Sequence, residues 1–338
     1  MSRKHAYPHG ENGIVRLLES RYPAGAGVER GIGDDAAVLG PEPEGEYRLV
    51  TTDMLVEQID FRREWAPARK LGRKAVSVNL SDIAAMGARP RFFTVALGLP
   101  ADVPRSWIAQ LYRGLTEQGN AFGASLVGGD LSASPSGIVI SITLLGESVG
   151  RTVLYRSGGR AGDALYVTGI LGRSAAGLRL LQGGRPLPNR RAEREAVRAH
   201  LEPEPRCEAG MWLCQCGMVR CMMDLSDGLS ADLPRLCAAS GTAAEIDAAS
   251  LPVFREAAAW GFDPAALALD GGEDFELLFA VEGARSGQFE KMYPAHLPPA
   301  TRIGTMIRGK GQVWIRSGGG RGRLLGNHGY DHFRPKAE

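Results

Sequence analysis

The pattern of apolar and polar residues in the first half of the chain predicts alternating strands and helices. Short runs rich in β-branched and aromatic residues predict strands at 47–53, 91–100, 124–130 and 137–149. Apolar residues that recur every three or four positions predict helices at 67–87 and from about 104 to 122. The glycine-rich stretch 154–163 is typical of a turn, so we place a domain junction near residue 150.

The second half continues this alternation. Strands are predicted at 164–169, 218–224 and 243–247, and helices at about 173–181, 190–200 and 229–240. The sequence GGRPLPN at 183–189 ends the first of these helices, and residues 301–338 are predicted as short strands and loops. The fold class is therefore predicted to be α/β, with mixed sheets in two packed domains at residues 1–150 and 151–338.

One acidic residue, Asp82, falls on the apolar stripe of the helix predicted at 67–87. It shares that stripe with Leu71, Ala75, Val78 and Met86, and no Lys or Arg lies one turn before or after it. An unpaired carboxylate on a core-facing stripe costs roughly several kcal/mol unless a positive group meets it. The pattern therefore predicts that Asp82 binds something positive.

Composition and charge exclude several classes of protein. The chain has 338 residues, of which 44% are hydrophobic and 23% charged, as in ordinary soluble proteins. A formal net charge of +2 gives no sign of nucleic-acid or membrane binding. The first residues contain no apolar segment of the signal-peptide kind, and the longest apolar run, 137–145, is too short to cross a bilayer. We therefore expect a cytoplasmic protein.

The five cysteines all lie between residues 207 and 237. An odd, clustered count argues against a secreted disulfide framework. Cys207, Cys214, Cys216 and Cys221 match no CxxC pair of the zinc-ribbon kind, so buried thiols are favoured over a metal site.

Candidate chemistry lies in six short acidic motifs, most of which follow a glycine or end a predicted strand. They are GIGDD (31–35), TTD (51–53), SD (81–82), GGD (128–130), DLSDG (224–228) and GGED (271–274). Each alone is typical of a surface turn. Together they indicate carboxylates that hold Mg²⁺ on phosphate groups, because Mg²⁺ prefers oxygen ligands and shares its shell with phosphates. The chain lacks a P-loop, the HRD and DFG motifs of protein kinases, a GxSxG elbow and a Rossmann fingerprint.

The order of the motifs GIGDDAAVL, TTDMLVE, NLSDIAAMGA, GGDLS, YRSGG, DLSDGLSADL, GGEDFELLF and GYDHF resembles the thiamine-monophosphate kinase family. That family belongs to the superfamily of aminoimidazole ribonucleotide synthetase. The resemblance covers residues 11–333, and NLSDIAAMGA together with GGEDFELLF is specific. It implies transfer of the γ-phosphoryl group of ATP to thiamine monophosphate, with several Mg²⁺ ions and no covalent phosphoenzyme.

The resemblance also implies a homodimer. In relatives the N-terminal domains, which bind ATP and Mg²⁺, pair across strands, and their interface helps to form the active site. The apolar segments FFTVALGL (92–99) and GIVISITLL (137–145) fit this expectation, because strands of this kind need cover on both faces.

Carried over motif by motif, the resemblance implies three groups of site residues. Mg²⁺ ligands are implied at Asp35, Thr52, Asp53, Asp82, Asp130, Asp224 and Asp227, and at Thr51 through its backbone. Contacts to ATP are implied at Tyr112, Gly129, Asp130, Arg156 and Ser226. Contacts to the acceptor are implied at Asp60, Glu273 and Tyr330. Asp60 departs from the family pattern, because relatives commonly carry His in VEGVHF where this chain has VEQIDF. No catalytic nucleophile or general base is expected, because a phosphate monoester already carries an oxyanion at neutral pH.

Plainer interpretations stand beside some of these residues. Asp34 is interpreted as a turn or capping residue, and the spacing of His328 and His332 does not favour a zinc site because no helix is predicted there. Arg173 is either a phosphate contact at a helix start or an exposed surface residue.

Other enzymes of the superfamily are less compatible with the chain. Selenophosphate synthetase needs a reactive Cys near the N-terminus, and the hydrogenase-maturation carbamoyl dehydratase ends in a Cys, whereas this chain has neither. Aminoimidazole ribonucleotide synthetase lacks the GGEDFELLF motif. A catalytically silent nucleotide-binding regulator would have lost metal-binding acids, and none is lost here.

Overall fold

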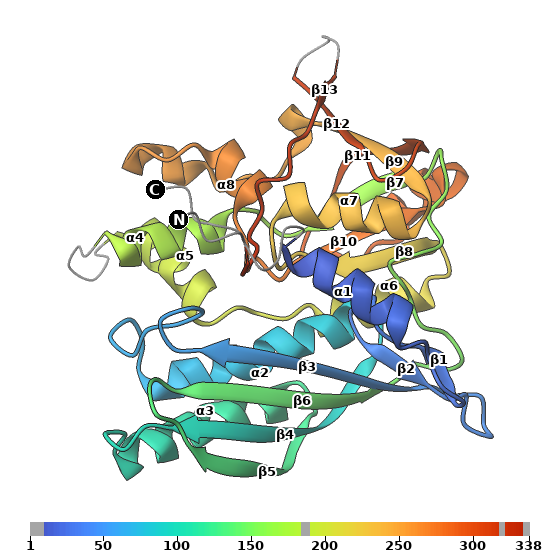
Figure 1. The fold of residues 1–338 in the computed structure, drawn as a ribbon. Helices are drawn as coiled ribbons and strands as arrows, with labels where there is room; N and C mark the ends of the chain where they lie inside the picture. The colour runs from blue at the N-terminus through green and yellow to red at the C-terminus, as the bar shows by residue number, and fades with distance from the viewer. Residues whose placement is uncertain (1–9, 184–189, 318–321, 334–338) are drawn as a thin grey trace, which may run out of the picture.

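Two mixed β-sheets, one from each half of the chain, form the framework of the computed structural model (Figure 1). The structure describes residues 10–183, 190–317 and 322–333. The first sheet has the strand order β1 (Val28–Arg30), β2 (Ala37–Leu39), β3 (Arg48–Val56), β6 (Val139–Glu147), β4 (Arg89–Leu99) and β5 (Ser125–Ala133). Only β4 and β5 pair in parallel. The prediction of an α/β protein with mixed sheets is confirmed.

Two helices cover one face of the first sheet. These are α2 (Ala68–Ala85), which begins after Pro67, and α3 (Arg105–Ala121). On β6 the side chains of Ile140, Ile142 and Leu144 are buried against them, while Ser141 and Thr143 point to the other face. This alternation follows from the two-residue period of a strand.

The opposite face of the first sheet is open. Met54, Phe92 and Leu145 on this sheet are 59%, 44% and 38% exposed. Figure 1 shows β3, β6, β4 and β5 with no helix in front of them in the described part of the chain. The two long apolar strands are therefore covered on one face only.

The second sheet is buried on both faces at its centre. Its order is β13 (Arg323–Leu324), β12 (Val313–Arg316), β9 (Thr242–Asp247), β11 (Ala300–Arg308), β7 (Ala164–Thr168), β10 (Leu277–Val281) and β8 (Val219–Asp224). Along β7, Leu165 and Val167 join a core cluster with residues of α7 (Leu229–Ala239). Ala164 and Tyr166 point the other way and join a cluster with residues of α2.

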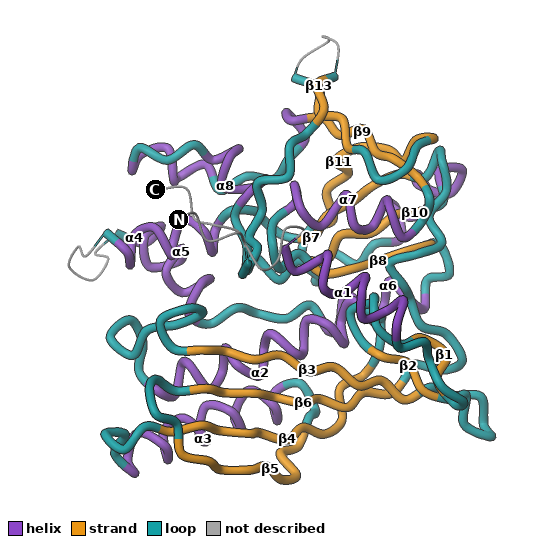
Figure 2. Tube along the Cα trace, in the orientation of Figure 1, coloured by secondary structure: helices purple, strands orange, loops and turns teal. Residues whose placement is uncertain are grey.

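The cluster that contains Ala164 and Tyr166 has residues from both halves of the chain, so the apolar cores of the two halves are continuous. It contains Leu80 and Ile83 of α2 together with Tyr166, Leu213 and Phe279 from the second half. Helix α6 (Cys207–Gln215) packs directly on α2. Helix α1 (Gly10–Arg21) also contacts the second half, because Arg235 donates a hydrogen bond to Asn12 at 3.1 Å. Figure 2 shows α1 beside β8 and α7, above the ends of β1 and β2.

Most predicted elements are present, with some differences in length. Helices α4 (Arg173–Gln182) and α5 (Arg191–Leu201) and the strands β7, β8 and β9 lie where the pattern placed them. Strands β3 and β5 run three residues further than predicted, so Asp53 and Asp130 lie within strands instead of at their ends. Residues 184–189 of the predicted helix-ending stretch lie outside the described residues.

Several elements had no prediction. They are α1, β1, β2, α6, β10, α8 (Pro264–Asp270), α9 (Ser286–Met292) and the 3-10 helices at Ala248–Ser250, Arg255–Trp260 and Gly283–Arg285. The five cysteines are free thiols, four of them buried, as predicted. Among the described helices, none has the length and apolar character needed to cross a bilayer.

Candidate functional site

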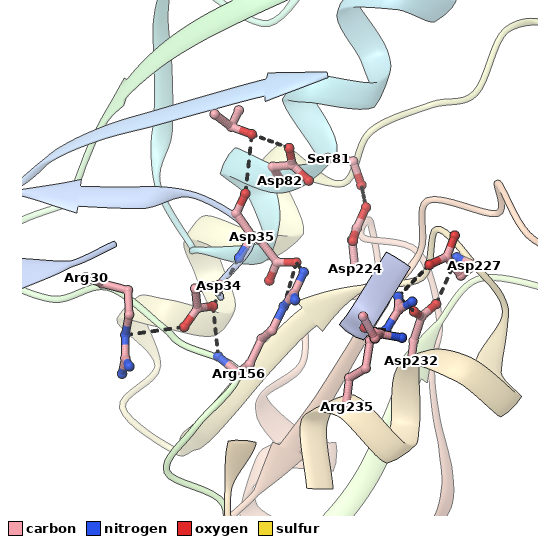
Figure 3. Close-up of polar contacts among 12 residues, drawn as sticks. Arg30, Asp34, Asp35, Ser81, Asp82, Arg156, Asp224, Asp227, Asp232 and Arg235 are labelled. Carbon is pink, nitrogen blue, oxygen red and sulfur yellow. Dashed lines mark hydrogen bonds and ion pairs between the residues drawn. The ribbon is translucent and has the colours of Figure 1, made fainter. Parts of the chain in front are cut away.

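Acidic side chains from four separate elements meet where the two halves join. Asp35 precedes β2, Asp53 lies on β3, Asp82 lies in the last turn of α2, and Asp224 is the last residue of β8. One carboxylate oxygen from each of Asp35, Asp82 and Asp224 lies within 4.8 Å of the other two (Figure 3). We call Asp35, Asp53, Asp82 and Asp224 the acidic cluster.

Hydroxyl and guanidinium groups fix these carboxylates. The Thr51 hydroxyl donates a short hydrogen bond to Asp82, and the Ser81 hydroxyl donates to Asp224 at 2.7 Å. Arg156 donates to Asp35 through Nε at 3.1 Å and through Nη2 (Figure 3). The residue next to Asp82 thus orients an acid of the other half of the molecule.

Burial and mutual repulsion favour the protonated form of the acidic cluster. Burial raises the pKa of Asp82 well above its usual range, and Asp53, Asp224 and Asp35 raise it further. Burial and Asp35 likewise raise the pKa of Asp224. Burial raises the pKa of Asp53 to about 6. Like charges held together in this way need a cation to become ionised together at neutral pH.

The cluster fits a divalent cation. Asp35 Oδ2 and Asp53 Oδ2 are buried and have no hydrogen-bond partner, although a buried carboxylate oxygen is normally satisfied. Carboxylate oxygens are the ligands that Mg²⁺ prefers, and an ion placed among them would satisfy both atoms. Asp35, Asp53, Asp82 and Asp224 are therefore the residues of this chain that could hold Mg²⁺.

A second acidic group lies beside the cluster, in the loop after β8 and at the start of α7. Arg235 pairs with both Asp227 and Asp232, and Asp232 also accepts a hydrogen bond of 3.0 Å from the Asp227 backbone N–H. Asp227 is therefore tied to an arginine in this structure (Figure 3). Ser226 is half-buried in the same loop, and its carbonyl accepts a 2.7 Å hydrogen bond from the Glu273 N–H.

The three predicted acceptor contacts influence one another electrostatically. Burial raises the pKa of Tyr330, and the charges of Asp60 and Glu273 raise it further. The backbone N–H of Tyr330 donates a hydrogen bond of 2.9 Å to the carbonyl of Asp227. The Asp60 carboxylate also accepts a 2.8 Å hydrogen bond from the Val56 N–H, which closes its own loop.

Four predicted residues lie elsewhere in this chain. The Thr52 side chain points to the open face of the first sheet, where it bonds the carbonyl of Ile142. Gly129 and Asp130 lie on the edge strand β5, three strand spacings or roughly 14 Å from β3. Tyr112 lies on α3, one of the two helices that cover the first sheet. The roles of these four residues stay predictions.

Asp34, Arg173 and His332 have interpretations other than ligand binding, and the structure shows where each side chain lies. Asp34 accepts hydrogen bonds from the backbone N–H groups of Asp35 and Arg156, as a capping residue does. Arg173 matches neither alternative fully: it starts α4, but its guanidinium lies over the Phe254 ring, 5.9 Å from the centroid. His332 packs its edge on Tyr330.

Sequence reasoning missed Ser81, Lys74 and His200. Ser81 was visible only as the neighbour of Asp82. Lys74 gave a signal that could have been used, because it is one of only six lysines and lies one turn from Leu71 and Val78 on the predicted helix. His200 gave none, because its partners lie far from it along the chain.

The fold and the acidic cluster define a protein of the AIR synthase related class. The model of the N-terminal domain of AIR synthase related protein matches residues 33–148, and that of the C-terminal domain matches residues 160–316. The hydrogenase maturation protein HypE shares this fold at a TM-score of 0.68 and 20% identity.

Closer relatives define the family. The thiamine-monophosphate kinase of Escherichia coli (strain K12) is 39% identical over 324 residues, which cover 95% of this chain and 97% of that protein. The enzyme of the same name from Mycobacterium tuberculosis is 40% identical over 281 residues, or 81% of each chain. The solved structure of AaThiL complexed with AMPPCP and TMP superposes with a TM-score of 0.80 at 32% identity, covering 93% of this chain and 96% of that one. The chain belongs to the thiamine-monophosphate kinase family.

Proposed function

We propose that this protein transfers the γ-phosphoryl group of ATP to the phosphate of thiamine monophosphate, giving thiamine diphosphate. The observation that carries the proposal is the acidic cluster, in which buried carboxylate oxygens from both halves converge and two of them have no partner. Relatives named thiamine-monophosphate kinase, and a solved relative bound to AMPPCP and TMP, support the choice of donor and acceptor.

The protein's own residues act by alignment and by charge. Three of the acids, Asp35, Asp82 and Asp224, are held by Arg156, Thr51 and Ser81, so they are already in place before a nucleotide binds. Asp35, Asp53, Asp82 and Asp224 would hold Mg²⁺, which would supply positive charge to offset the negative charge of the phosphate groups. The Arg156 side chain, which is 23% exposed, supplies a fixed positive charge toward the nucleotide phosphates.

We infer a direct in-line transfer without a phosphorylated enzyme. The acceptor phosphate brings its own oxyanion, so the site needs no strong general base and provides orientation and charge neutralisation. Asp227 and Ser226, in the loop that leads from β8, are proposed to complete the metal and nucleotide contacts.

One assay separates the candidate functions. Purified protein is given ATP and Mg²⁺ with thiamine, thiamine monophosphate or aminoimidazole precursors, each offered alone, and ADP formation is followed. We expect turnover with thiamine monophosphate only, because free thiamine lacks both the oxyanion and the metal-bridging oxygens. Efficient use of free thiamine would overturn the acceptor. Turnover of an aminoimidazole precursor would point to another enzyme of the superfamily. If none of the three acceptors is used, a catalytically silent regulator is indicated.

We further propose a homodimer formed through the open face of the first sheet. Met54, Phe92 and Leu145 expose apolar surface there, and such a patch is typical of an interface. A second copy on this face could also bring its own Gly129 and Asp130 toward the acidic cluster, which the same residues of one chain do not reach. Sedimentation should give a dimer at micromolar concentration, and Phe92→Glu should give a monomer.

An exposed aromatic on the second sheet serves as control for that measurement. Trp314 on β12 is 39% exposed, and Trp314→Glu should leave the dimer intact. A monomeric wild-type protein would contradict the proposal.

The protein is proposed to act in the cytoplasm, where ATP and Mg²⁺ are available and where five free thiols stay reduced.

A further inference from the structure

Three acidic side chains of the segment Gly271–Glu276 contact three different parts of the molecule. The Asp274 carboxylate accepts hydrogen bonds from the Gly172 and Ser174 N–H groups, at 2.6 and 3.2 Å, where α4 begins. The Glu276 carboxylate is 5% exposed and pairs with Arg206. These two acids therefore tie the segment into the second half. Glu273 is different, because its side chain is 29% exposed.

The Glu273 backbone adopts a conformation that side chains disfavour. Its φ is +64°, and that of Phe275 is +49°. Such left-handed residues cost roughly 1 kcal/mol or more and persist where the surroundings impose them. Here, the Glu273 N–H bonds the carbonyl of Ser226 at 2.7 Å and the Phe275 N–H bonds that of Leu225 at 2.9 Å. The loop after β8 thus holds the backbone of Glu273 in this conformation.

Two buried basic side chains meet the Glu273 carboxylate, one on each oxygen. Lys74 Nζ on α2 lies 2.7 Å from Oε1, and His200 Nδ1 on α5 lies 3.1 Å from Oε2. The side chains of Lys74 and His200 are only 2% and 3% exposed. A carboxylate held at both oxygens by groups from two helices has one orientation, and each oxygen keeps a lone pair that can accept a further hydrogen bond.

The charge of Glu273 is fixed as firmly as its orientation. Burial would raise the pKa of Glu273, but Lys74 and His200 lower it to about 2. Burial and Lys74 lower the pKa of His200, so His200 is neutral at pH 7 and donates its Nδ1 proton. At neutral pH, Glu273 therefore acts only as an acceptor.

Lys74 has a feature that folding alone does not explain. Its ammonium group is buried and has no hydrogen bond of good geometry to any described residue beyond the ion pair with Glu273. It lines a cavity of about 10 Å³ together with Asp60, Trp65 and His200. An apolar side chain of the same length would fill this position at lower desolvation cost. The lysine is thus suited to acting on Glu273 more than to stabilising the core.

We propose that Lys74 and His200 are positioning residues of the acceptor site, which aim the Glu273 carboxylate so that it accepts hydrogen bonds from the amino group on the pyrimidine ring of the acceptor. This inference rests on the proposed function, because it assumes thiamine monophosphate as acceptor. The Glu273 N–H bonds the carbonyl of Ser226, and the Tyr330 N–H bonds the carbonyl of Asp227 in the same loop. The acceptor's ring would then lie next to the metal and phosphate groups.

The test measures KM and kcat for the acceptor and for ATP in Lys74→Met and Lys74→Arg. Losing one charge-assisted hydrogen bond corresponds to roughly a tenfold or greater loss of affinity. We expect Lys74→Met to raise KM for thiamine monophosphate about tenfold, with kcat and KM for ATP changed less than about twofold. Lys74→Arg should recover part of the loss. Lys70→Met removes an exposed lysine of the same helix, paired with Glu202, and should match the wild type.

A second readout uses the acceptor analogue in which the pyrimidine amino group is replaced by a carbonyl oxygen. A site built to accept a hydrogen bond rejects such an analogue. The wild type should prefer the amino acceptor strongly, and Lys74→Met and His200→Gln should lose most of this preference. In Lys74→Met/Glu273→Gln, KM for the acceptor should equal that of Glu273→Gln alone, since Lys74 acts only through Glu273. This double variant also leaves no unpaired charge, so it covers the case in which Lys74→Met folds poorly.

The outcomes separate the inference from the proposed function. If the wild type and Lys70→Met phosphorylate thiamine monophosphate but Lys74→Met keeps the wild-type KM and preference, only the positioning role is overturned. Equal rises in KM for ATP and for the acceptor would show a purely structural role and overturn it as well. If the wild type does not use thiamine monophosphate, the proposed function fails and the positioning role falls with it.

Discussion

Asp82 shows how one side chain can be unfavourable in the fold and suited to a site. It lies in the last turn of α2, beside Asp53, Asp224 and Asp35, with the Thr51 hydroxyl as its hydrogen-bond donor. A helix of otherwise apolar contacts would be more stable with a neutral residue there. The Mg²⁺ proposed above would explain why an acid stands at this position.

Replacing Asp82 with Asn should therefore separate stability from activity. We expect Asp82→Asn to raise the free energy of unfolding of the metal-free protein at pH 8 by about 1–2 kcal/mol, since a buried charge among like charges is removed. It should lower kcat at least about 100-fold, because a ligand of the proposed metal is lost. Urea unfolding and the ADP assay measure the two effects. Asp102→Asn, at an acid 65% exposed and paired with Arg63, is the control and should change neither.

The same residue predicts a pH dependence of stability. The folded-state pKa values of Asp82, Asp224 and Asp53 are raised, that of Asp53 to about 6. A raised acid pKa means that the folded state binds more protons, so its contribution to stability is full below the unfolded pKa of about 4 and is lost as pH rises through the folded pKa. The metal-free wild type should thus lose stability from pH 5 to 8 more steeply than Asp82→Asn.

Unfolding in urea with a chelator at pH 5, 6, 7 and 8 measures this difference. Added Mg²⁺ should stabilise the wild type more at pH 8 than at pH 5, because binding displaces the protons that the acids otherwise hold. Parallel pH profiles for the wild type and Asp82→Asn would contradict the account.

Some of these site residues could be predicted from the sequence and others could not, for physical reasons. Asp82 stood out because a helical period places it among apolar residues, which is local information. Lys74 was not singled out, because its partner Glu273 lies in the other half of the molecule. Thr51 and Thr52 were predicted as a pair, but adjacent residues on a strand face opposite sides, so only Thr51 reaches the acidic cluster.

At the scale of elements, strand ends were harder to predict than strand positions. Strand β3 continues to Val56 because Met54 and Leu55 pair with Ser141 and Ile140 of β6, a non-local contact. Strand β10 was not predicted, and the GGED segment before it is held by non-local contacts to the start of α4 and to the loop after β8. The alternation of elements could be predicted, whereas the packing of α6 on α2 could not.

That packing gives a test at the level of two helices. A Cβ added to Gly210 of α6 would lie 2.1 Å from the Ala84 carbonyl oxygen of α2, so the helices would have to separate. We expect Gly210→Ala to destabilise the protein by about 1–3 kcal/mol and to lower activity, because Ala84 lies two residues from Asp82.

A glycine in an open position is the control for this substitution. Gly287 in α9 has no atom within 4 Å of an added Cβ, and Gly287→Ala should be neutral or slightly stabilising. The two variants are compared by urea unfolding and by the ADP assay. Equal stabilities would show that α2 and α6 can move apart without cost.

At the scale of the whole molecule, the positions of Asp82 and Asp130 predict a complementation. Asp130 lies on the edge strand of the open sheet, and Asp82 lies at the junction between the halves. If each active site takes Asp82 from one copy and Asp130 from the other, Asp82→Asn and Asp130→Asn are both inactive alone. Random mixing makes half of the dimers mixed, each with one intact site, so about a quarter of wild-type activity should return.

The mixed sample is prepared by dissociating and reassociating the two variants together. A control mixture of Asp82→Asn with Asp224→Asn should stay inactive, since both defects then affect the same set of ligands. No recovery in the first mixture would mean that Asp130 serves its own chain or has no role in the site.

The continuous core of the two halves has a consequence for how the chain can be divided. Gly150 is exposed, and nothing lies within 4 Å of an added Cβ there, so a cut at this point leaves the packing intact. Each fragment alone would expose the apolar surface that Leu80 and Ile83 share with Tyr166 and Phe279, and we expect each to aggregate. Produced together, residues 1–150 and 151–338 should bind each other through that surface and restore the kinase. The protein would then serve as a split reporter, whose signal depends on two separately encoded pieces finding each other.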